Sequence, residues 1–281
     1  MIDLHAHSTA SDGTLSPTEL IALAAREGLV AVALTDHDTV AGLDEAAAAA
    51  REAGVGFVPG IELEVEWQKG VFHMLGLGLE RWTGEVRARL ELALTFRKER
   101  NLAMVDELRR AHIPVTYDEL VQIAGHETVG RPHFAQWLLN HGFVSSMQEA
   151  FDTLIGDGQP CYVAKKGLSV GKTCDAVHAA GGVAVVAHPQ TLRMSWDDLA
   201  RSLERWKGEG LDGIEAYHAN LTCNDGHRLA ALAEGIGLIT TAGSDFHGPP
   251  RTDRRLGRCC DGLPIDDRFL APIGMYAHAG D

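Results

Sequence analysis

Short apolar runs that favour β-strands alternate with helix-forming segments in the first and last parts of the chain. The runs lie at positions 1–4, 30–35, 56–61, 71–75, 183–187 and 238–242. After the first run, Ser16-Pro17-Thr18-Glu19 is a capping box with proline at the first helical position, which predicts a helix to about Arg26. Asp38 is expected to cap the alanine-rich run Leu43–Ala53. Strands that alternate with helices predict an α/β fold with a parallel sheet, and 281 residues are enough for one barrel of this kind.

The middle of the chain follows a different pattern, without a convincing strand from about Glu85 to Asp157. We predict helices at 87–110, after a second capping box at 116–119, at 132–141 and at 146–154. The alternation resumes with a helix at 169–180 and a strand at 182–187. This indicates an all-helical subdomain inserted at 86–165, between barrel segments 1–85 and 166–281. The tail from Arg251 is expected to be a loop that wraps the barrel.

Charge and cysteine content narrow the function. The net charge is −14, which argues against a surface for gripping duplex nucleic acid. Positions 97–172 carry nine basic and nine acidic residues, so this segment is neutral and the rest of the chain carries the whole net charge of −14. This uneven distribution of charge suits a small polyanionic substrate. No run approaches the roughly 20 apolar residues of a membrane helix, and the start lacks a signal-peptide pattern, so no membrane partner is expected. Five cysteines without framework spacing predict reduced thiols and a cytoplasmic location.

Imidazoles and carboxylates gather where the apolar runs end. In a parallel barrel the strand ends emerge on one face, so we expect nine such residues to meet there: His5, His7, Asp12, His37, Glu62, His73, His188, Asp245 and His247. Six histidines and three carboxylates exceed the roughly four to six ligands of one cation, which predicts a centre of two or three divalent ions. This mixture of donors suits Mn²⁺, Fe²⁺ and Zn²⁺ without choosing among them.

Some residues of these segments also have a purely structural interpretation. His73 lies in the run 71–75 and could be a half-buried core histidine, although ligation is preferred. Asp36 and Asp38 flank His37, and we expect them to cap or to orient neighbours rather than to bind an ion. The predicted ligand set therefore includes His37 and His73 but not Asp36 or Asp38.

Five spaced motifs carry a resemblance to a known family. They are H-x-H-x₄-D-G from His5, T-D-H-D from Thr35, the glutamate after Pro59-Gly60-Ile61, A-H-P from Ala187 and S-D-x-H from Ser244. In this order they resemble the PHP (polymerase and histidinol phosphatase) domain of the amidohydrolase-like superfamily, over residues 1–80 and 170–250. The resemblance implies a distorted (β/α)₇ barrel, similar to a TIM barrel, with a trinuclear centre. It also implies one ion held by His5, His7, Glu62 and Asp245, a second by Asp12, His37 and His247, and a third by Glu62, His73 and His188.

Within this group, the helical insertion with Gly130-Arg131-Pro132-His133 is similar to the 3′,5′-nucleoside bisphosphate phosphatases, which are also linked to 5′→3′ trimming of RNA ends. Arg131 lies at a helix start, where free N–H groups favour phosphate, but an ordinary surface arginine fits equally. The candidate substrate contacts are Asp12, Arg131, His133, Lys165, Lys166, His218 and Asn220. Either lysine could reach a phosphate or be solvated, and His218 could donate a proton or orient a neighbour.

The resulting hypothesis is metal-dependent hydrolysis of a phosphomonoester. The substrate would be a nucleoside 3′,5′-bisphosphate, a hydroxide bridging two ions would attack phosphorus, and Asp12 and His218 would act in catalysis. His218 or a metal-bound water would protonate the leaving 3′-oxygen. Mn²⁺ is the expected metal, with Fe²⁺ or Zn²⁺ as alternatives. Three other functions stay open: a histidinol phosphatase, an exoribonuclease acting on short single-stranded RNA 5′ ends, and a non-catalytic metal- or nucleotide-binding module. Loss of ligands would mark the module, and none is lost.

Overall fold

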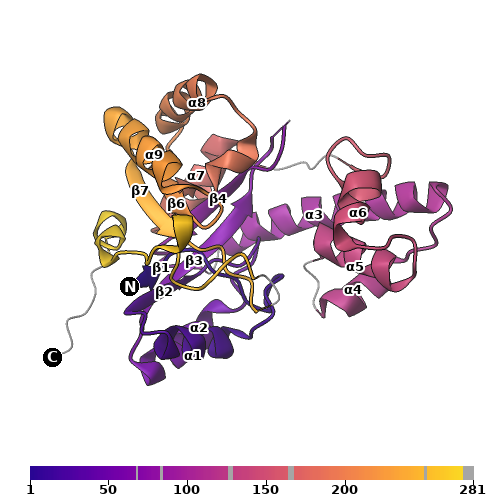
Figure 1. Ribbon diagram of the computed structural model, residues 1–281, viewed down its shortest axis with the longest axis horizontal. Helices are drawn as coiled ribbons and strands as arrows, with labels where there is room; N and C mark the ends of the chain where they lie inside the picture. The colour runs from indigo at the N-terminus through magenta and orange to yellow at the C-terminus, as the bar shows by residue number, and fades with distance from the viewer. Residues whose placement is uncertain (68, 83–84, 126–128, 164–167, 250–251, 275–281) are drawn as a thin grey trace.

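A computed structural model describes residues 1–67, 69–82, 85–125, 129–163, 168–249 and 252–274, without the side chains of 85–94. Seven strands form one sheet in chain order: β1 (Ile2–Asp3), β2 (Ala31–Leu34), β3 (Gly56–Glu64), β4 (His73–Leu77), β5 (Val183–Val186), β6 (Gly213–His218) and β7 (Ile239–Gly243). Backbone hydrogen bonds from Leu4 N to Ala242 O (3.3 Å) and from His7 N to Phe246 O (2.9 Å) join the first and last strands. The sheet thus nearly closes into the predicted seven-stranded barrel (Figure 1).

One strand runs against the others. Strands β1 to β3 are parallel and so are β5 to β7, whereas β4 is antiparallel to both of its neighbours. Only residues 65–72 connect β3 to β4, too few for the crossover that a parallel pair needs. The prediction of an all-parallel sheet is therefore wrong at β4. His73 is the first residue of β4 rather than following a strand, and Glu62 lies inside β3 rather than after it.

Helices α1 (Pro17–Arg26), α2 (Leu43–Ala53), α7 (Val170–Ala179), α8 (Trp196–Gly208) and α9 (Cys223–Ile236) surround the barrel (Figure 1). Alternate strand residues serve two cores, because successive side chains of a strand point to opposite faces. In β2, Ala31 and Ala33 join the cluster shared by the strands, while Val32 and Leu34 join the cluster shared with the helices. The outer helices thereby hold the strand ends in place.

Local capping is confirmed for α1 and corrected for α2. Ser16 Oγ accepts a hydrogen bond from Glu19 N (3.2 Å), as the capping box predicts. The N-cap of α2 is Gly42, without a side-chain hydrogen bond. Asp38 Oδ1 accepts instead from Glu64 N in β3 (3.0 Å). The prediction that Asp38 caps α2 is wrong because a neighbouring strand supplies its donor.

The long helix α3 (Glu85–Arg110) leads to a helical body formed by α4 (Tyr117–Ala124), α5 (Arg131–Asn140), α6 (Met147–Ala150) and a π-helical turn, Phe151–Ile155. Figure 1 shows this body beside the barrel. It has a core of its own, which includes Leu108, Phe134 and Leu138. The predicted helices are present to within a few residues. The subdomain boundaries at 86 and 165 stay a prediction.

The described part of the tail, 252–274, is not the plain loop that was expected. It contains short 3-10 helices at Cys260–Gly262, Asp267–Phe269 and Ala271–Ile273. Its residues Ile265 and Phe269 are buried in the core cluster of the strands. In the described part of the chain, no helix has the length and apolarity needed to cross a membrane.

Candidate metal centre

The nine predicted ligands converge at one end of the barrel. Asp12, His37 and His73 are partly buried and the other six are buried. They come from the segments after β1, β2, β5 and β7, from within β3 and from the start of β4. Because β4 is antiparallel, its first residue lies at the same end as the last residues of the parallel strands. The reversed strand therefore explains why His73 meets the others.

Glu62 lies at the middle of the group. Its Oε1 is 2.8 Å from His188 Nε2 and 3.0 Å from His73 Nδ1. Its Oε2 is 2.9 Å from His37 Nδ1 and 3.4 Å from His7 Nε2. Burial opposes ionisation, but the surrounding imidazoles hold the pKa of Glu62 well below its usual range. An ionised carboxylate with histidines at both oxygens is placed to bridge two cations.

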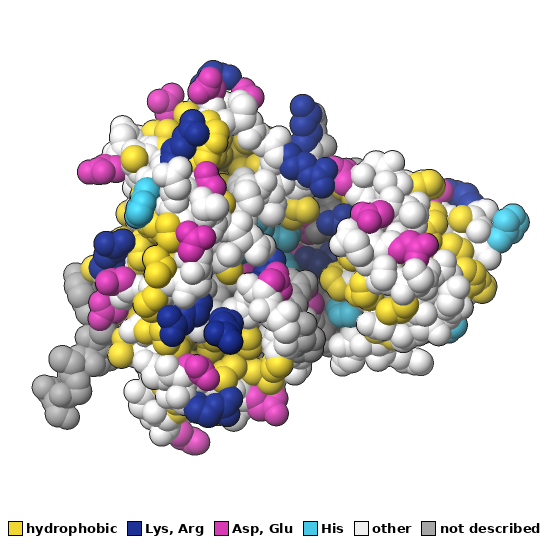
Figure 2. All heavy atoms as spheres, viewed as in Figure 1, with side chains coloured by type: hydrophobic (Ala, Val, Ile, Leu, Met, Phe, Trp, Pro, Cys, Tyr) yellow, Lys and Arg dark blue, Asp and Glu magenta, His cyan; other side chains and the backbone are white. Residues whose placement is uncertain are grey.

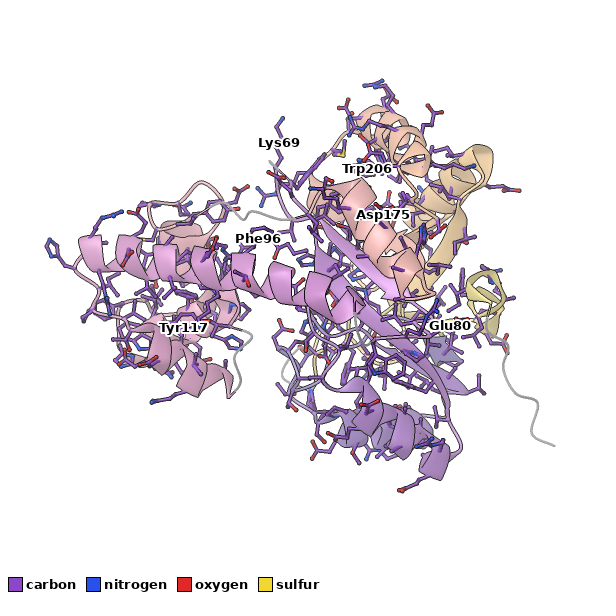
Figure 3. The ribbon with its side chains drawn as sticks, turned by 180° about the vertical axis from the view of Figure 1, so that it is seen from behind. Lys69, Glu80, Phe96, Tyr117, Asp175 and Trp206 are labelled. Atoms are coloured by element: carbon purple, nitrogen blue, oxygen red, sulfur yellow. The ribbon has the colours of Figure 1, made fainter. Side chains whose placement is uncertain are left out.

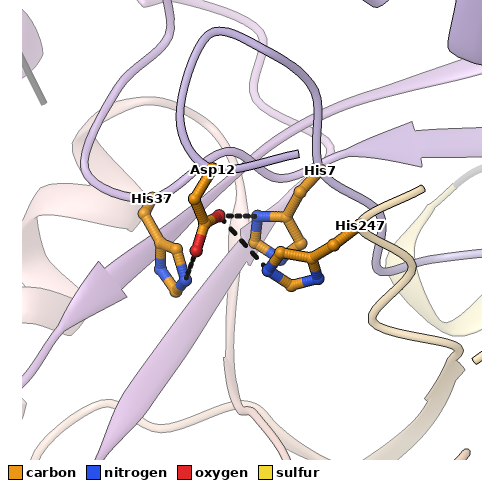
Figure 4. A group of neighbouring side chains, drawn as sticks. All are labelled: His7, Asp12, His37 and His247. Carbon is orange, nitrogen blue, oxygen red and sulfur yellow. Dashed lines mark ion pairs between the residues drawn. The ribbon is translucent and has the colours of Figure 1, made fainter. Parts of the chain in front are cut away.

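Asp12 forms a second group with three histidines, shown in Figure 4. Its Oδ1 lies 3.2 Å from His247 Nε2 and 3.9 Å from His7 Nδ1, and its Oδ2 lies 3.9 Å from His37 Nε2. Asp36 fixes the loop that carries Asp12, because its carboxylate accepts hydrogen bonds from Ser8 N (2.8 Å) and Ser11 Oγ (2.5 Å). The orienting role expected for Asp36 is confirmed.

Asp245 completes a third group with His5 and His7. Its Oδ1 is 3.1 Å from His7 Nε2 and 3.4 Å from His5 Nε2. The two imidazole Nε2 atoms are themselves only 3.1 Å apart. Burial, with His247 and His37 nearby, lowers the pKa of His7 to about 3, so its ring is neutral. The neutral His7 ring and the ionised Asp245 carboxylate, whose pKa the neighbouring histidines hold well below its usual range despite burial, point lone pairs at the same small volume.

This donor chemistry fits divalent cations. Donor atoms of three sets lie within 4.8 Å of one another: His7, Asp12, His37 and His247; His5, His7, Glu62 and Asp245; and His37, Glu62 and His73. Two of these ligand atoms, His7 Nδ1 and Glu62 Oε2, are buried and have no hydrogen-bond partner in the described part of the chain. Converging lone pairs with few protons between them are costly unless positive charge binds there. Which residue holds which ion stays a prediction.

A cavity of about 240 Å³, here the metal cavity, opens above these residues. Its lining also includes Arg97, Arg100 and Arg131, here the arginine cluster. Figure 2 shows cationic and histidine side chains inside the hollow between the barrel and the helical body. Asp38 and Glu64 pair with Arg97, and the Arg131 guanidinium lies over the rings of Phe151 (5.9 Å) and Tyr162 (5.7 Å). The metal cavity thus brings metal ligands and guanidinium groups together in one lining.

Arg100 is the unusual member of the arginine cluster. Arg100 is only 4% exposed, and no carboxylate among the described residues pairs with its guanidinium group. Its Nε lacks a hydrogen bond in that part of the chain, and its Nη2 meets Met104 Sδ at 3.3 Å. Burial next to Arg131 and Arg97 lowers the pKa of Arg100 to about 9. Arg97 is already paired with Asp38 and Glu64, so Arg100 with Arg131 beside it forms the candidate site for an anion.

The other predicted substrate contacts have mixed outcomes. His218 and Asn220 line the metal cavity, and His218 Nδ1 accepts from Asn220 N (3.1 Å). His133 Nδ1 accepts from Gly130 N (2.9 Å) at the start of α5, and the described lining of the cavity does not include His133. Lys165 and Lys166 fall outside the described residues.

A model of the PHP domain matches residues 3–257 of the chain. The chain belongs to the PHP domain family. It is 37% identical over 247 residues to a 5′-3′ exoribonuclease of Haemophilus influenzae, covering 88% of this chain and 90% of that protein. It is 36% identical over 265 residues to a 3′,5′-nucleoside bisphosphate phosphatase of Chromobacterium violaceum, covering 94% and 93%.

A solved structure agrees with the PHP fold. An amidohydrolase from Chromobacterium violaceum, with bound sulfate and no metal, superposes with a TM-score of 0.85 at 35% identity. The match covers 97% of this chain and 96% of that one. The resemblance read from the five motifs is thereby confirmed, and so is the expected barrel.

Two residues that position the centre of this PHP domain were missed from the sequence. Glu215 in β6 is fully buried; its Oε1 is 2.9 Å from His5 Nδ1, and its Oε2 accepts from His188 N (2.7 Å). Arg254 in the tail donates to Asp245 O (3.0 Å) and pairs with its Oδ2. A glutamate inside an apolar strand was the available signal for Glu215. No local sequence pattern pointed to Arg254, because its partner Asp245 lies on the other side of a loop.

Proposed function

We propose that this PHP domain hydrolyses the 3′-phosphate of nucleoside 3′,5′-bisphosphates, with two or three divalent cations and Mn²⁺ as the preferred metal. The observation that carries the proposal is the shared cavity, whose lining includes seven of the nine predicted metal ligands together with the arginine cluster. A substrate with two phosphate groups needs two separate anion sites, and a simple phosphomonoester needs only one. The phosphatase of Chromobacterium violaceum, similar along nearly its whole length, supports the same substrate class.

The metal donors would hold the scissile phosphate side of the substrate. The sets implied by the resemblance are His5, His7, Glu62 and Asp245 for one ion, Asp12, His37 and His247 for another, and Glu62, His73 and His188 for a third. Bound cations would supply Lewis acidity toward the phosphoryl oxygens and lower the pKa of nearby water. Asp12, which borders the cavity and is ionised beside His247 and His37, would bind metal and orient the scissile phosphate.

One of the chain's own residues is placed to stabilise the leaving 3′-oxygen. In the reaction a water oxygen attacks phosphorus, the bond from phosphorus to the 3′-oxygen breaks, and that oxygen takes up a proton. His218 accepts a hydrogen bond at Nδ1 from Asn220 N, so its proton is on Nε2, which is 3.5 Å from Asp245 Oδ2. This tautomer directs an N–H group at the metal end of the cavity. We assign His218 a hydrogen bond from Nε2–H to the leaving 3′-oxygen; because this ring carries a single proton, the proton that this oxygen takes up comes from water.

The arginine cluster would bind the 5′-phosphate. A phosphate placed there pairs with Arg100, whose charge has no carboxylate partner in the described chain, and with Arg131, which is held by two aromatic rings. Bidentate contacts between guanidinium and phosphate add geometric selectivity as well as energy.

The direct test is phosphate release from a substrate panel in Mn²⁺. The panel contains adenosine 3′,5′-bisphosphate, 5′-AMP, histidinol phosphate and an aryl phosphate, each with and without a chelator. We expect the bisphosphate to be hydrolysed best, and chelation to abolish turnover until Mn²⁺ is restored. Hydrolysis of histidinol phosphate alone would assign a different phosphatase, and tight nucleotide binding without turnover would indicate a binding module.

A pair of variants tests the role of the arginine cluster. Arg131→Ala should lower kcat/KM for the bisphosphate by about 10- to 100-fold, because charge-assisted hydrogen bonds contribute about 1.5–3 kcal/mol. The same variant should leave kcat/KM for the aryl phosphate nearly unchanged. Arg51→Ala, on the exposed face of α2, is the control. Equal losses on both substrates would contradict a 5′-phosphate site.

A second activity, phosphodiester cleavage at RNA 5′ ends, is favoured by the 37% identical exoribonuclease of Haemophilus influenzae. The same bond, from the 3′-oxygen of the first nucleoside to phosphorus, breaks in both reactions. The cytoplasmic location expected from the sequence stays a prediction.

A further inference from the structure

A second cavity, here the rim groove, lies beside the metal cavity. Its volume is about 560 Å³, and its described lining includes four basic residues, Lys69, Arg193, Arg201 and Arg205, against one acidic residue, Asp198. The whole chain carries a net charge of −14, so an excess of positive charge here runs against the average of the protein. A concave basic surface on an acidic protein indicates a site for a polyanion.

The rim groove and the metal cavity share a wall. Val71 and Thr191 line the metal cavity, whereas Lys69 and Arg193, each two positions away in the chain, line the rim groove. A hydrogen bond from Val71 N to Thr191 O (2.9 Å) ties the two wall segments together. Figure 3 shows Lys69 projecting from the connection between β3 and β4. A polymer that leaves the metal cavity across this wall enters the rim groove.

Positive charge continues from the arginine cluster into the rim groove. Burial lowers the pKa of Arg131, and the nearby charges of Arg97 and Arg193 lower it further. Arg193 Nη1 lies 3.3 Å from Asp157 Oδ2, two residues after the turn Phe151–Ile155 whose first ring lies under Arg131, so the two arginines meet the same segment although one lines the metal cavity and the other the rim groove. Figure 2 shows dark-blue cationic side chains along the edge of the same hollow.

Asp198, Asp157 and Glu209 each pair with one arginine of the rim groove, and the three arginine side chains are largely exposed. Arg201 Nη2 pairs with Asp198 Oδ1 at 2.6 Å, but the two side chains are 69% and 55% exposed. Arg193 Nη1 lies 3.3 Å from Asp157 Oδ2, with the arginine side chain 67% exposed. Exposed ion pairs of this kind contribute about 0–1 kcal/mol. A phosphate can therefore replace the carboxylate at little cost.

We propose that the rim groove binds the backbone of a single-stranded oligoribonucleotide downstream of the phosphate that occupies the metal centre. This inference rests on the proposed function, since it uses the same scissile bond. In a 3′,5′-bisphosphate, the 3′-phosphate ends the molecule. In an oligonucleotide, that phosphate is esterified to the next nucleoside, so the chain needs a cationic path out of the metal cavity. Water adds to phosphorus, the 3′-oxygen of the first nucleotide leaves with a proton, and the shortened strand keeps a 5′-phosphate.

The experiment compares one groove variant with a matched control on short and long substrates. The groove variant is Lys69→Gln, Arg201→Gln and Arg205→Gln together, and it leaves Arg193 and its contact to the helical body in place. The control is Arg26→Gln, Arg51→Gln and Arg110→Gln, three exposed residues whose loss changes the net charge equally. Substrates are adenosine 3′,5′-bisphosphate and 5′-phosphorylated oligoribonucleotides of two, four and eight nucleotides.

We expect kcat/KM of the natural sequence to rise with oligonucleotide length. At low salt, kcat/KM of the groove variant for the octamer should be about tenfold or more below that of the natural sequence. The slope of log kcat/KM against log salt concentration should become less steep by about 2, because each phosphate contact removed contributes roughly 0.7 to it. The groove variant should hydrolyse the bisphosphate within twofold of the natural sequence. The control variant should retain both activities.

Anisotropy of a labelled, 5′-phosphorylated octamer, measured with a chelator present, gives a readout that does not depend on turnover. Weaker binding by the groove variant and unchanged binding by the control support the rim groove. Unchanged octamer binding and cleavage in the groove variant would overturn it, and so would an equal loss on the bisphosphate. If the natural sequence cleaves the bisphosphate but neither binds nor cleaves the octamer, the rim groove fails while the proposed phosphatase stands. If it binds the octamer through the groove but releases no phosphate from the bisphosphate, the proposed phosphatase fails instead.

Discussion

Replacing Arg100 by methionine should make the protein more stable and less able to use a bisphosphate. Arg100 is 4% exposed, its Nε has no hydrogen-bond partner in the described chain, and it lies beside Arg97 and Arg131. Methionine keeps an unbranched apolar stem of similar length and already has a neighbour of the same kind, Met104. The substitution therefore removes a buried charge without opening a large cavity.

The expected magnitude follows from the pKa. Burial next to Arg131 and Arg97 lowers the pKa of Arg100 to about 9, at least three pKa units below an ordinary arginine, which corresponds to an electrostatic cost on the order of 4 kcal/mol. The cost is full below pH 9 and shrinks above it, since the folded protein then releases the proton more readily than the unfolded chain. Relaxation and the lost contacts of the guanidinium offset part of it. We expect the free energy of unfolding to rise by about 1–3 kcal/mol at pH 7.

Urea unfolding followed by circular dichroism, in a chelator and without nucleotide, measures this change. In Mn²⁺, kcat/KM of Arg100→Met for the bisphosphate should fall by about 10- to 100-fold, because a phosphate loses a charge-assisted contact of about 1.5–3 kcal/mol. Arg51→Met on the exposed surface should change neither quantity. A variant less stable than the natural sequence would show that Arg100 has a compensating partner, and an unchanged kcat/KM would remove it from the phosphate site.

Four further substitutions test other parts of the molecule. Glu215→Gln should weaken Mn²⁺ binding by about 10- to 100-fold in titration calorimetry, because either amide orientation loses the hydrogen bond to His5 Nδ1 or the one to the main chain; unchanged affinity would rule out this positioning role. Gly243→Ala should lower both the melting temperature and Mn²⁺ affinity, since its Cβ would lie 2.3 Å from the Cβ of His5 and 2.5 Å from Glu215 Oε1. Gly235→Ala, with no atom within 4 Å, should instead stabilise α9 by about 1 kcal/mol. Burial raises the pKa of the Cys174 thiol to about 12, so its contribution to stability is full below pH 9 and is lost as the pH rises toward 12. The free energy of unfolding should then fall with pH above 9 more steeply in the natural sequence than in Cys174→Ala, and parallel pH profiles would contradict that shift.

Local sequence determined the elements and the chemistry of the donors. The capping boxes at Ser16 and Thr116 begin α1 and α4 as predicted, because the bonds that define them join residues only three apart. The clustering of histidines and carboxylates at strand ends was readable for a similar reason, since a β-strand followed by a helix brings its C-terminal end to one face of a barrel. The PHP family itself could be recognised from five such ends.

Only the tertiary structure decided how those donors are held and what faces them. The reversal of β4 brings His73 to Glu62, and the closure of the sheet places Glu215 behind His5, 210 residues earlier in the chain. Arg100 becomes a candidate for anion binding only through its burial beside Arg131, which no local pattern reports. A residue type can be read from the chain, but its burial, its charge partners and its pKa depend on which distant segments pack against it.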